Sequence, residues 1–448
     1  MYNHLDTNTT IVAPATAAGG AVMVVRLSGP KAIEIADRLF RGRQRLADAD
    51  GYTLHYGRIV DTDNIVVDDV VVALFRAPHS YTGDDTVEIT LHGSEYITSD
   101  VLRLVIDQGA VMAMPGEFTR RAFLAGKMDL SRAEAVADVI ASDSKWSHAV
   151  ASTQMRGGYS ERLATLRNEL LRLASLLELE LDFSEEDVEF ADRTSLHTTL
   201  DNIASQIDVL ISSFTLGNAL KNGVNVTIIG RPNVGKSTLL NSLVEEDRAM
   251  GSDIAGTTRD TIEATTTIDG VRYRFVDTAG IHSTDDRLEQ MGIDRTHRAI
   301  ANAAVILHLA AADNPEFEEV DYRPEQHYIR VVNKMDTATI AHNDSEVVYI
   351  SAKSGFGIDT LRNRLSATVD TSQIGTGSVV VSNMRHYAAL REAYNALMAA
   401  RTAMDMGLPS DLLSEDIRQV LHHLGEITGA ITSDDILQSI FSKFCIGK

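Results

Sequence analysis

The sequence is poor in cysteine and in aromatic residues. Cys445 is its only cysteine, Trp146 its only tryptophan, and aromatic residues make up 6% of the 448 positions. A single cysteine forms no internal disulfide and builds no zinc site by itself. The chain also has no apolar run long enough to span a bilayer and no signal peptide at its start. These absences indicate a reducing compartment, and we expect the protein in the cytoplasm.

Basic residues are scarce as well. The chain has 41 Lys and Arg against 63 Asp and Glu, a formal net charge of −22 at pH 7. Because non-specific binding to nucleic acid depends on clustered Lys and Arg, this balance excludes a protein that coats nucleic acid. If RNA is a partner, a local basic patch or a second protein must hold it. The length itself indicates about three domains.

What the sequence does contain is a glycine-rich loop, Gly230 to Ser237, between an apolar run at 225–229 and a helical run at 238–243. Strand, G-x-x-x-x-G-K-[ST] loop and helix together form a phosphate site, because backbone N–H groups and the helix N-terminus face the anion. We expect Lys236 to reach the β- and γ-phosphate oxygens and Ser237 to ligate Mg²⁺. The predicted nucleotide contacts here are Asn233, Val234, Gly235, Lys236, Ser237 and Thr238.

Further motifs follow predicted strands in the order of a GTPase. Asp277 is placed to reach Mg²⁺ through water, while the Gly280 N–H approaches the γ-phosphate. The Asp336 carboxylate accepts hydrogen bonds from guanine N1 and N2, which adenine cannot donate, and this selects GTP. The predicted contacts are Asp277, Thr278, Ala279, Gly280, Asn333, Lys334, Asp336, Ser351, Ala352 and Lys353. Strands at 264–268, 272–276, 304–309, 328–332 and 347–350, most of them alternating with helices, predict a mostly parallel sheet.

The segment between the phosphate loop and Asp277 is rich in hydroxyl groups and glycine, as a switch loop is. Thr258 is the natural second hydroxyl ligand of Mg²⁺. Arg259 is either an arginine finger or an ordinary surface arginine. The predicted nucleotide contacts in this segment are Ser252, Asp253, Ile254, Ala255, Gly256, Thr257 and Thr258.

The residue that assists hydrolysis departs from the Ras-like pattern. In Ras-like GTPases a glutamine after Asp-x-x-Gly orients the attacking water, but here that position is Ile281. Asp285, Asp286 and Glu289 lie downstream, and each offers a carboxylate that can orient or polarise water. The residues alone leave the choice among them open.

The rest of the chain divides into segments that differ in their predicted strands and helices. Residues 1–118 mix strands at 10–13, 21–27, 65–73 and 86–91 with helices at 31–40 and 94–108, which predicts an α+β domain. Helical periodicity appears in runs at 117–142, 159–181 and 200–214 and returns after the GTPase segment, which places the helical domain at 119–216 and 376–448. The α/β P-loop GTPase segment lies between them at 217–375. This order predicts one discontinuous all-α domain with the GTPase inserted, although two separate helical domains would give much the same pattern.

Taken together, these motifs resemble one family, the tRNA wobble-uridine modification GTPases (MnmE, also called TrmE). The resemblance covers essentially the whole chain. The GTPase strings are shared by many GTPases, and the specific part is their combination with strings near the two ends of the chain. These are Arg26-Leu27-Ser28-Gly29, Ser80 to Asp85 with Glu88, Pro115 to Thr119 with Lys127 to Leu130, and Phe444-Cys445-Ile446-Gly447-Lys448.

The resemblance implies roles for individual residues. The N-terminal domain would bind tetrahydrofolate and form the dimer. Asn233, Ser252, Ile254 and Thr257 would hold K⁺, which neutralises charge between the phosphates as an arginine finger does. Glu289 would be the catalytic carboxylate, with Lys236 and Gly280 also in the catalytic centre, and Cys445 would lie in the active site. The folate contacts would be Arg26, Glu88, Lys127 and Lys448. One departure is that the turn at 16–20 lacks the arginine that the family often carries there.

The implied activity is a K⁺-stimulated GTP hydrolase that works as a homodimer with an FAD/NADH-dependent partner of the MnmG (GidA) type, in a heterotetramer. It would add a carboxymethylaminomethyl or aminomethyl group to C5 of wobble uridine in tRNA. The one-carbon donor would be 5,10-methylenetetrahydrofolate, with 5-formyltetrahydrofolate as an analogue. The alternatives are a ribosome-assembly or regulatory GTPase switch without group transfer, and a folate-dependent aminomethyl transferase that works without GTP.

Overall fold

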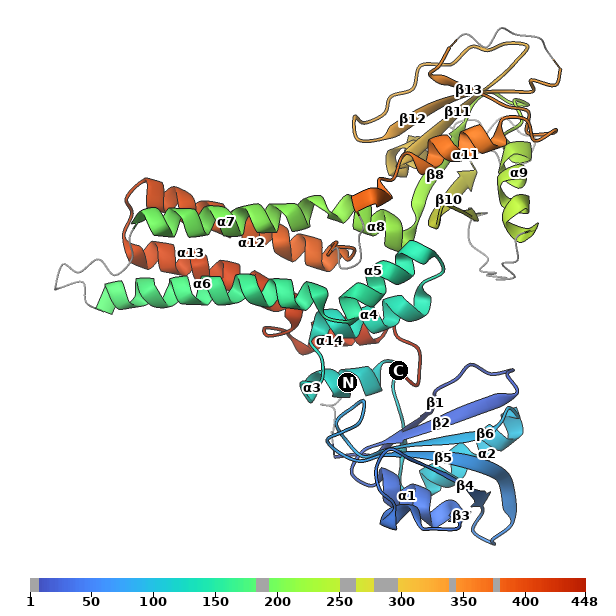
Figure 1. Cartoon of the computed structure of the whole chain (residues 1–448), viewed down its shortest axis with the longest axis vertical. Helices are drawn as coiled ribbons and strands as arrows, with labels where there is room; N and C mark the ends of the chain where they lie inside the picture. The colour runs from blue at the N-terminus through green and yellow to red at the C-terminus, as the bar shows by residue number, and fades with distance from the viewer. Residues whose placement is uncertain (1–7, 183–192, 250–262, 278–296, 338–343, 374–378) are drawn as a thin grey trace, which may run out of the picture. The chain divides into compact units, whose positions relative to one another are not determined.

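The computed structural model describes residues 8–182, 193–249, 263–277, 297–337, 344–373 and 379–448 (Figure 1). The chain divides into two compact units. The first contains residues 1–137, 160–167 and 421–448, and the second contains 138–159 and 168–420. Of the helices in the described ranges, none combines the length and the apolar character needed to cross a bilayer.

The first unit is built on a seven-stranded sheet of order β3-β4-β5-β6-β2-β1-β7. Its pairs are antiparallel except for the parallel pair β1 and β7. Helices α1 (Ala32–Leu39) and α2 (Glu95–Asp107) cover one face and bury a core of aliphatic side chains. The strands are β1 (Ile11–Pro14), β2 (Val22–Ser28), β3 (Phe40–Gly42), β4 (Thr53–Val60), β5 (Val66–Phe75), β6 (Thr86–His92) and β7 (Val111–Met112).

The α+β prediction for this part of the chain is confirmed, with β4 as the main omission. Residues at alternate positions of β4, Leu54 and Tyr56, are exposed. An exposed apolar residue followed by polar ones gives no clear period-two signal, so the strand is hard to detect from sequence. It forms because β5 pairs with it along its length.

The helical run predicted at 117–142 is two helices. Helix α3 (Glu117–Leu124) ends before Gly126, which adopts a left-handed φ of 68°, and α4 (Leu130–Ala141) begins after the turn. Glycine tolerates that backbone conformation without steric cost, so the turn falls there. Helix α14 (Asp434–Phe441) completes this unit, and its Leu437 and Phe441 pack with Leu130.

The helical part of the second unit comes from both sides of the nucleotide-binding segment. Helix α7 precedes that segment and packs along α12, which follows it (Figure 1). Arg401 of α12 and Asp201 of α7 form an ion pair at 3.1 Å. The helical domain is therefore discontinuous, as predicted, while its boundaries at 119–216 and 376–448 stay a prediction. The helices are α5 (Lys145–Met155), α6 (Gly158–Asp182), α7 (Arg193–Ser212), α8 (Phe214–Asn222), α12 (Met384–Asp405) and α13 (Ser410–Thr428).

The nucleotide-binding segment is a six-stranded sheet of order β13-β12-β11-β8-β10-β9. Every pair is parallel except the β9–β10 hairpin, so the predicted mostly parallel sheet is confirmed. Helices α9 (Lys236–Ala249) and α11 (Ile358–Ser366) pack on it. The strands are β8 (Val224–Ile229), β9 (Glu263–Ile268), β10 (Val271–Asp277), β11 (Val305–Ala311), β12 (His327–Asn333) and β13 (Val347–Tyr349).

Candidate functional site

The phosphate loop leaves the carboxyl end of β8, a buried strand that pairs with both β10 and β11. The loop's glycines are required by contact as well as by conformation. Gly230 has φ of 140°, and a Cβ there would lie 2.2 Å from the Leu309 carbonyl oxygen. Gly235 has φ of 97°, and a Cβ would lie 2.3 Å from Asn333 Nδ2. Both glycines therefore let neighbouring strands approach the loop closely, which is what a phosphate cradle needs.

Lys236 opens helix α9 and points back into this loop. Its Nζ donates hydrogen bonds to the carbonyl oxygens of Gly230 at 2.7 Å and Arg231 at 2.9 Å. The ammonium group is thus held at the mouth of a helix N-terminus, beside backbone N–H groups. Positive charge, amide dipoles and the neighbouring Ser237 hydroxyl suit a nucleotide polyphosphate with Mg²⁺.

Asn333 joins the phosphate loop to the base-recognition segments. This side chain is 2% exposed. Its Nδ2 donates to the Val234 carbonyl at 2.8 Å, and its Oδ1 accepts from the Ala352 N–H at 3.0 Å. The predicted motifs at 233–238, 333–336 and 351–353 therefore lie together. Sequence analysis placed Asn333 among the nucleotide contacts, whereas its side chain serves here to connect the loops.

The Asp336 carboxylate is held by Ser351, which belongs to the segment at 351–353. The Ser351 hydroxyl donates to its Oδ1 at 2.6 Å, and this hydrogen bond lowers the pKa of the Asp336 carboxyl, with the charges of Lys353 and Lys334 as smaller contributions. The carboxylate is exposed, ionised and oriented. An oriented carboxylate that only accepts hydrogen bonds matches the donors on guanine N1 and N2.

Many predicted nucleotide contacts lie outside the described residues. They are Ser252, Asp253, Ile254, Ala255, Gly256, Thr257, Thr258, Thr278, Ala279, Gly280 and the catalytic Glu289, together with the alternatives Asp285 and Asp286 and the possible finger Arg259. Asp277 is described as the last residue of β10, which pairs with Ile228 of β8. The strand thus ends beside the phosphate loop, as the motif order requires.

In the first unit, two of the predicted folate contacts meet. Arg26 of β2 and Glu88 of β6 face each other across the strand pair and form an ion pair at 2.8 Å. Arg26 also donates to the Gly447 carbonyl at 3.1 Å, which brings the C-terminal segment to the same place. Its guanidinium lies 5.6 Å from the Phe118 ring centroid and 6.0 Å from that of Tyr81. Such aromatic faces favour a cation.

The remaining predicted folate contacts lie near this group. Lys127 is exposed, and its Nζ donates to the Pro78 carbonyl at 2.7 Å, on the chain that leads into Tyr81. Lys448 is the partly exposed last residue, next to Gly447. Close by, Pro14, Met23, Met112 and Ile446 help line a largely apolar cavity of about 460 Å³. Cys445, which directly precedes Ile446 in the sequence, is exposed.

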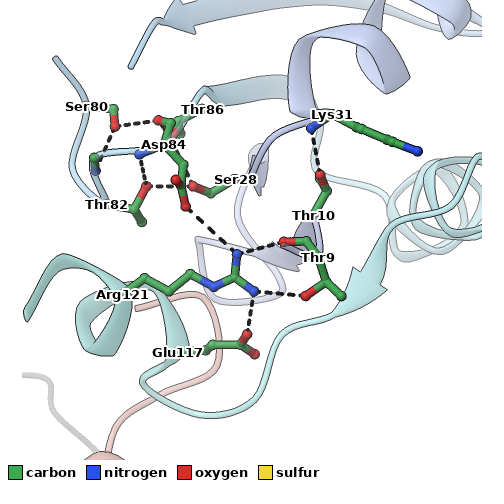
Figure 2. Close-up of polar contacts among 11 residues, drawn as sticks. Thr9, Thr10, Ser28, Lys31, Ser80, Thr82, Asp84, Thr86, Glu117 and Arg121 are labelled. Atoms are coloured by element: carbon green, nitrogen blue, oxygen red, sulfur yellow. Dashed lines mark hydrogen bonds and ion pairs between the residues drawn. The ribbon is translucent and has the colours of Figure 1, made fainter. Parts of the chain in front are cut away.

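A polar cluster centred on Arg121 supports the loop that carries Tyr81 (Figure 2). The Arg121 side chain is 2% exposed and binds Thr9, through its carbonyl at 2.7 Å and its hydroxyl at 3.1 Å. It also pairs with Glu117 at 2.9 Å and lies 3.9 Å from Asp84. Burial raises the pKa of Asp84, and the Arg121 charge opposes that rise. A buried guanidinium with partners on separate segments fixes their relative positions.

Comparison with known proteins identifies the family of the chain. The model of the MnmE helical domain matches residues 130–445, and that of the GTP-binding protein TrmE N-terminus matches residues 10–127. The tRNA modification GTPase MnmE of Cytophaga hutchinsonii is 47% identical over 460 residues, covering 100% of this chain and 99% of that protein. The chain belongs to the MnmE family of tRNA modification GTPases. MnmE of Porphyromonas gingivalis is also 47% identical, covering 99% of each chain.

Some solved structures are similar to part of this chain. Era of Aquifex aeolicus with GDP and AlF4⁻ is 26% identical, covers 39% of this chain and 66% of that one, and has a TM-score of 0.25. The FeoB G-domain of Methanococcus jannaschii is 24% identical, covers 33% and 97%, and has a TM-score of 0.24. Scores this low add nothing to what the geometry and the MnmE relatives establish.

Several residues of this MnmE chain have positions that sequence reasoning did not foresee. Tyr81 and Phe118 lie in strings that carried the resemblance, but no role followed for either from the sequence. Their proximity to Arg26 depends on strand pairing between β2 and β6 and on the turn before α3. The bond between Ser351 and Asp336 similarly joins positions that are separate in sequence. The sequence around Ser351 does not indicate which residue its hydroxyl will bind.

We predict that Asp336→Asn weakens guanine-nucleotide binding and favours xanthine nucleotides. An amide presents a donor to the guanine N2 donor, and each hydrogen bond left unmade costs about 1–3 kcal/mol, so GDP affinity should fall at least about tenfold. The same amide can donate to the 2-oxo group of xanthine. Calorimetric titration with GDP and XDP measures both effects.

The matched control is Asp344→Asn. Asp344 precedes β13 at the opposite end of the sheet and pairs with Arg330 at 3.3 Å, so neither nucleotide should be affected. Unchanged GDP affinity in Asp336→Asn would remove Asp336 from base recognition.

Proposed function

We propose that this chain is a K⁺-stimulated GTP hydrolase that acts in tRNA modification. As a homodimer with an FAD/NADH-dependent partner of the MnmG type, it adds a carboxymethylaminomethyl or aminomethyl group to C5 of wobble uridine. The observation that carries the proposal is the full-length identity with MnmE relatives, joined to the meeting of the phosphate loop, Asn333 and Asp336 at one sheet edge. We propose the cytoplasm as its location.

For hydrolysis, the described residues supply binding and positive charge. Lys236 lies at the loop mouth and Ser237 at the start of α9, where its hydroxyl suits Mg²⁺. Asn233 is exposed, with a left-handed φ of 62°, and an exposed amide oxygen suits a cation such as K⁺. The other proposed ligands of K⁺ (Ser252, Ile254 and Thr257) and of Mg²⁺ (Thr258), like the proposed base Glu289, lie outside the described residues. A K⁺ ion, when bound, supplies charge stabilisation between the phosphates.

For group transfer, the first unit offers a site with chemistry suited to folate. Glu88 presents a carboxylate that matches the donors of a pterin edge, and cations such as Lys127 and Lys448 match a glutamyl tail. The apolar cavity of about 460 Å³ nearby lies within the size range of small-molecule sites. These features support 5,10-methylenetetrahydrofolate as the one-carbon donor.

For assembly, an apolar group on the sheet of the first unit supports the dimer. Tyr56 and Val71 face each other across β4 and β5, and Leu54 lies two residues before Tyr56. Leu54 and Tyr56 are each 71% exposed. Exposed apolar groups of this kind mark interaction surfaces. The scarcity of Lys and Arg supports a second protein that helps to hold the tRNA.

The overall proposal predicts a defined loss in tRNA. Cells that lack this protein should accumulate wobble uridine without the C5 aminomethyl-type substituent, because the proposed function of the chain is to attach it. Mass spectrometry of digested tRNA nucleosides measures it, with a plasmid copy of the chain as the restoring control. An unchanged nucleoside profile would favour a regulatory GTPase switch without group transfer.

Hydrolysis should be faster in K⁺ than in Na⁺ at equal ionic strength. We expect a difference of at least about tenfold, which corresponds to about 1.4 kcal/mol in the barrier. Asn233→Ala should remove this difference while GDP still binds. Phosphate release, followed in both salts, measures the rate. Equal rates for the unaltered chain would exclude the cation from the mechanism.

The same assay tests the carboxylate. Glu289→Ala should bind GTP and lose turnover, because the water then has no group to orient it. Asp285→Ala, four residues earlier in the sequence, serves as the matched variant. Near-normal turnover in Glu289→Ala, with loss in Asp285→Ala, would assign the role to Asp285.

The full-length chain should bind 5-formyltetrahydrofolate, and Glu88→Gln should weaken that binding at least about tenfold. The amide loses the charge that favours the pterin donors, and charged hydrogen bonds are worth about 1.5–3 kcal/mol. Calorimetric titration measures the affinity. Glu34→Gln, which alters an exposed ion pair with Arg38, is the control. A chain without measurable folate affinity would contradict the group-transfer proposal and leave the GTPase assignment standing.

A further inference from the structure

The β9–β10 hairpin connects the segments on which GTP hydrolysis depends. Strand β9 begins at Glu263, directly after the segment that contains Thr258, and β10 ends at Asp277. Asp269 and Gly270 form its turn, with φ of 50° and 77°, between the paired residues Ile268 and Val271. Such a two-residue turn with positive φ at both positions is tight and fixes the strand register. A shift at one end of the hairpin is therefore carried along both strands.

Helix α5 of the helical domain contacts the tip of this hairpin. Trp146 Nε1 donates to the Asp269 carbonyl at 3.0 Å, and the Trp146 backbone N–H points to the Gly270 carbonyl at 3.4 Å. A Cβ on Gly270 would lie 3.2 Å from Trp146 Cδ1 and 3.2 Å from Lys145 Cβ. The indole ring therefore rests directly on the glycine of the turn.

A second contact lies on β10 itself. Arg272, two residues after the turn, forms an ion pair with Asp143, and each side chain is 33% exposed. Asp143 precedes the Ser144 cap of α5, so the ion pair and the indole contact come from one short stretch of the helical domain. The hairpin is thus held at two points, its tip and the side of β10.

The same part of the helical domain also contacts α8, the helix that precedes the strand leading into the phosphate loop. Lys221, near the end of α8, pairs with Asp138 of α4 at 2.7 Å. Strand β8 begins two residues after α8 ends. Val150 of α5 is buried in the core of the nucleotide-binding sheet. Residues 138–150 therefore contact both α8, the helix that precedes β8, and the hairpin that ends at Asp277.

We propose that Asp143 and Trp146 are positioning residues for GTP hydrolysis, which fix the β9–β10 hairpin on the helical domain and so link its geometry to the bound nucleotide. The inference rests on the proposed GTPase function and adds to it the residues that carry the link. Strand β10 has 7 residues and spans about 20 Å. A hydrogen-bonded ladder of that length moves as one body, so a change at Asp277 displaces the turn under Trp146.

The chain supplies its own reporter for this link, because Trp146 is its only tryptophan. The intensity or wavelength of its fluorescence should differ between the full chain with GDP and the full chain with a non-hydrolysable GTP analogue. Calorimetry on the same samples establishes that both nucleotides are bound. If neither binds, the proposed function fails. If both bind and the spectra superimpose, this inference is wrong and the function stands.

Asp143→Asn identifies the part played by the ion pair. This variant should lose most of the difference between the two spectra and should show a lower kcat for GTP with an unchanged KM, since nucleotide contacts are intact. Asp201→Asn is the control, because it weakens an ion pair of similar exposure between α7 and α12, far along the chain from the hairpin. Retention of the full spectral difference by Asp143→Asn, or equal loss in the control, would overturn the proposal.

Trp146→Phe provides an independent readout. The phenyl ring keeps contact with Gly270 but cannot donate to the Asp269 carbonyl, so kcat should fall while the thermal unfolding midpoint stays close to that of the unaltered chain. A residue with only a structural role would change the midpoint and leave kcat as it was. That outcome would exclude Trp146 as a positioning residue.

Discussion

The nucleotide site depends on the hydrogen bonds of one buried amide. Asn333 donates to the backbone of the phosphate loop and accepts from the backbone of the segment after β13, so it ties two loops to the end of its own strand. A buried amide that lost either partner would carry an unmet hydrogen-bonding group, at about 1–3 kcal/mol. Phosphate recognition and base recognition are therefore not independent. Asn333 connects the segment that carries the Lys236 ammonium to the end of the strand that leads to Asp336.

The sequence predicts the elements of this site better than the contacts among them. Strands β8, β11 and β12 were detectable because buried parallel strands are short apolar runs, and the phosphate loop follows β8 while the Asn333 motif ends β12. The role of Asn333 was not detectable, because its partners are backbone groups of residues far along the chain, and backbone groups carry no sequence signal. Strand β4 was missed for a related reason. Its pairing with β5 outweighs a weak local pattern.

The first unit shows the same division between motif and contact. Resemblance singled out Arg26, Glu88, Lys127 and Lys448, and the structure brings Arg26, Glu88 and the C-terminal Gly447 together. It adds aromatic neighbours and the buried Arg121, whose partners come from the N-terminal segment, the loop after β5 and α3. Arg121 binds a backbone carbonyl and a hydroxyl of Thr9 besides carboxylates. Such mixed partners cannot be read from charge patterns, which carry no information on backbone and hydroxyl acceptors.

The hydrogen bond from Arg26 to Gly447 joins residues that are 421 positions apart. The first unit therefore needs the last residues of the chain, and everything inserted between residues 168 and 420 is connected to that unit by covalent links at both of its ends. An insertion held in this way can change shape only if both connections accommodate the change. The nucleotide-binding segment is inserted in turn into the helical domain, between α8 and α12, and it contacts α5 through the β9–β10 hairpin. The hairpin contact with α5 links the sheet strand that ends at Asp277 to the helical domain. This gives a physical reason why a nucleotide-dependent change at Asp277 would act on the helical domain rather than dissipate within the sheet.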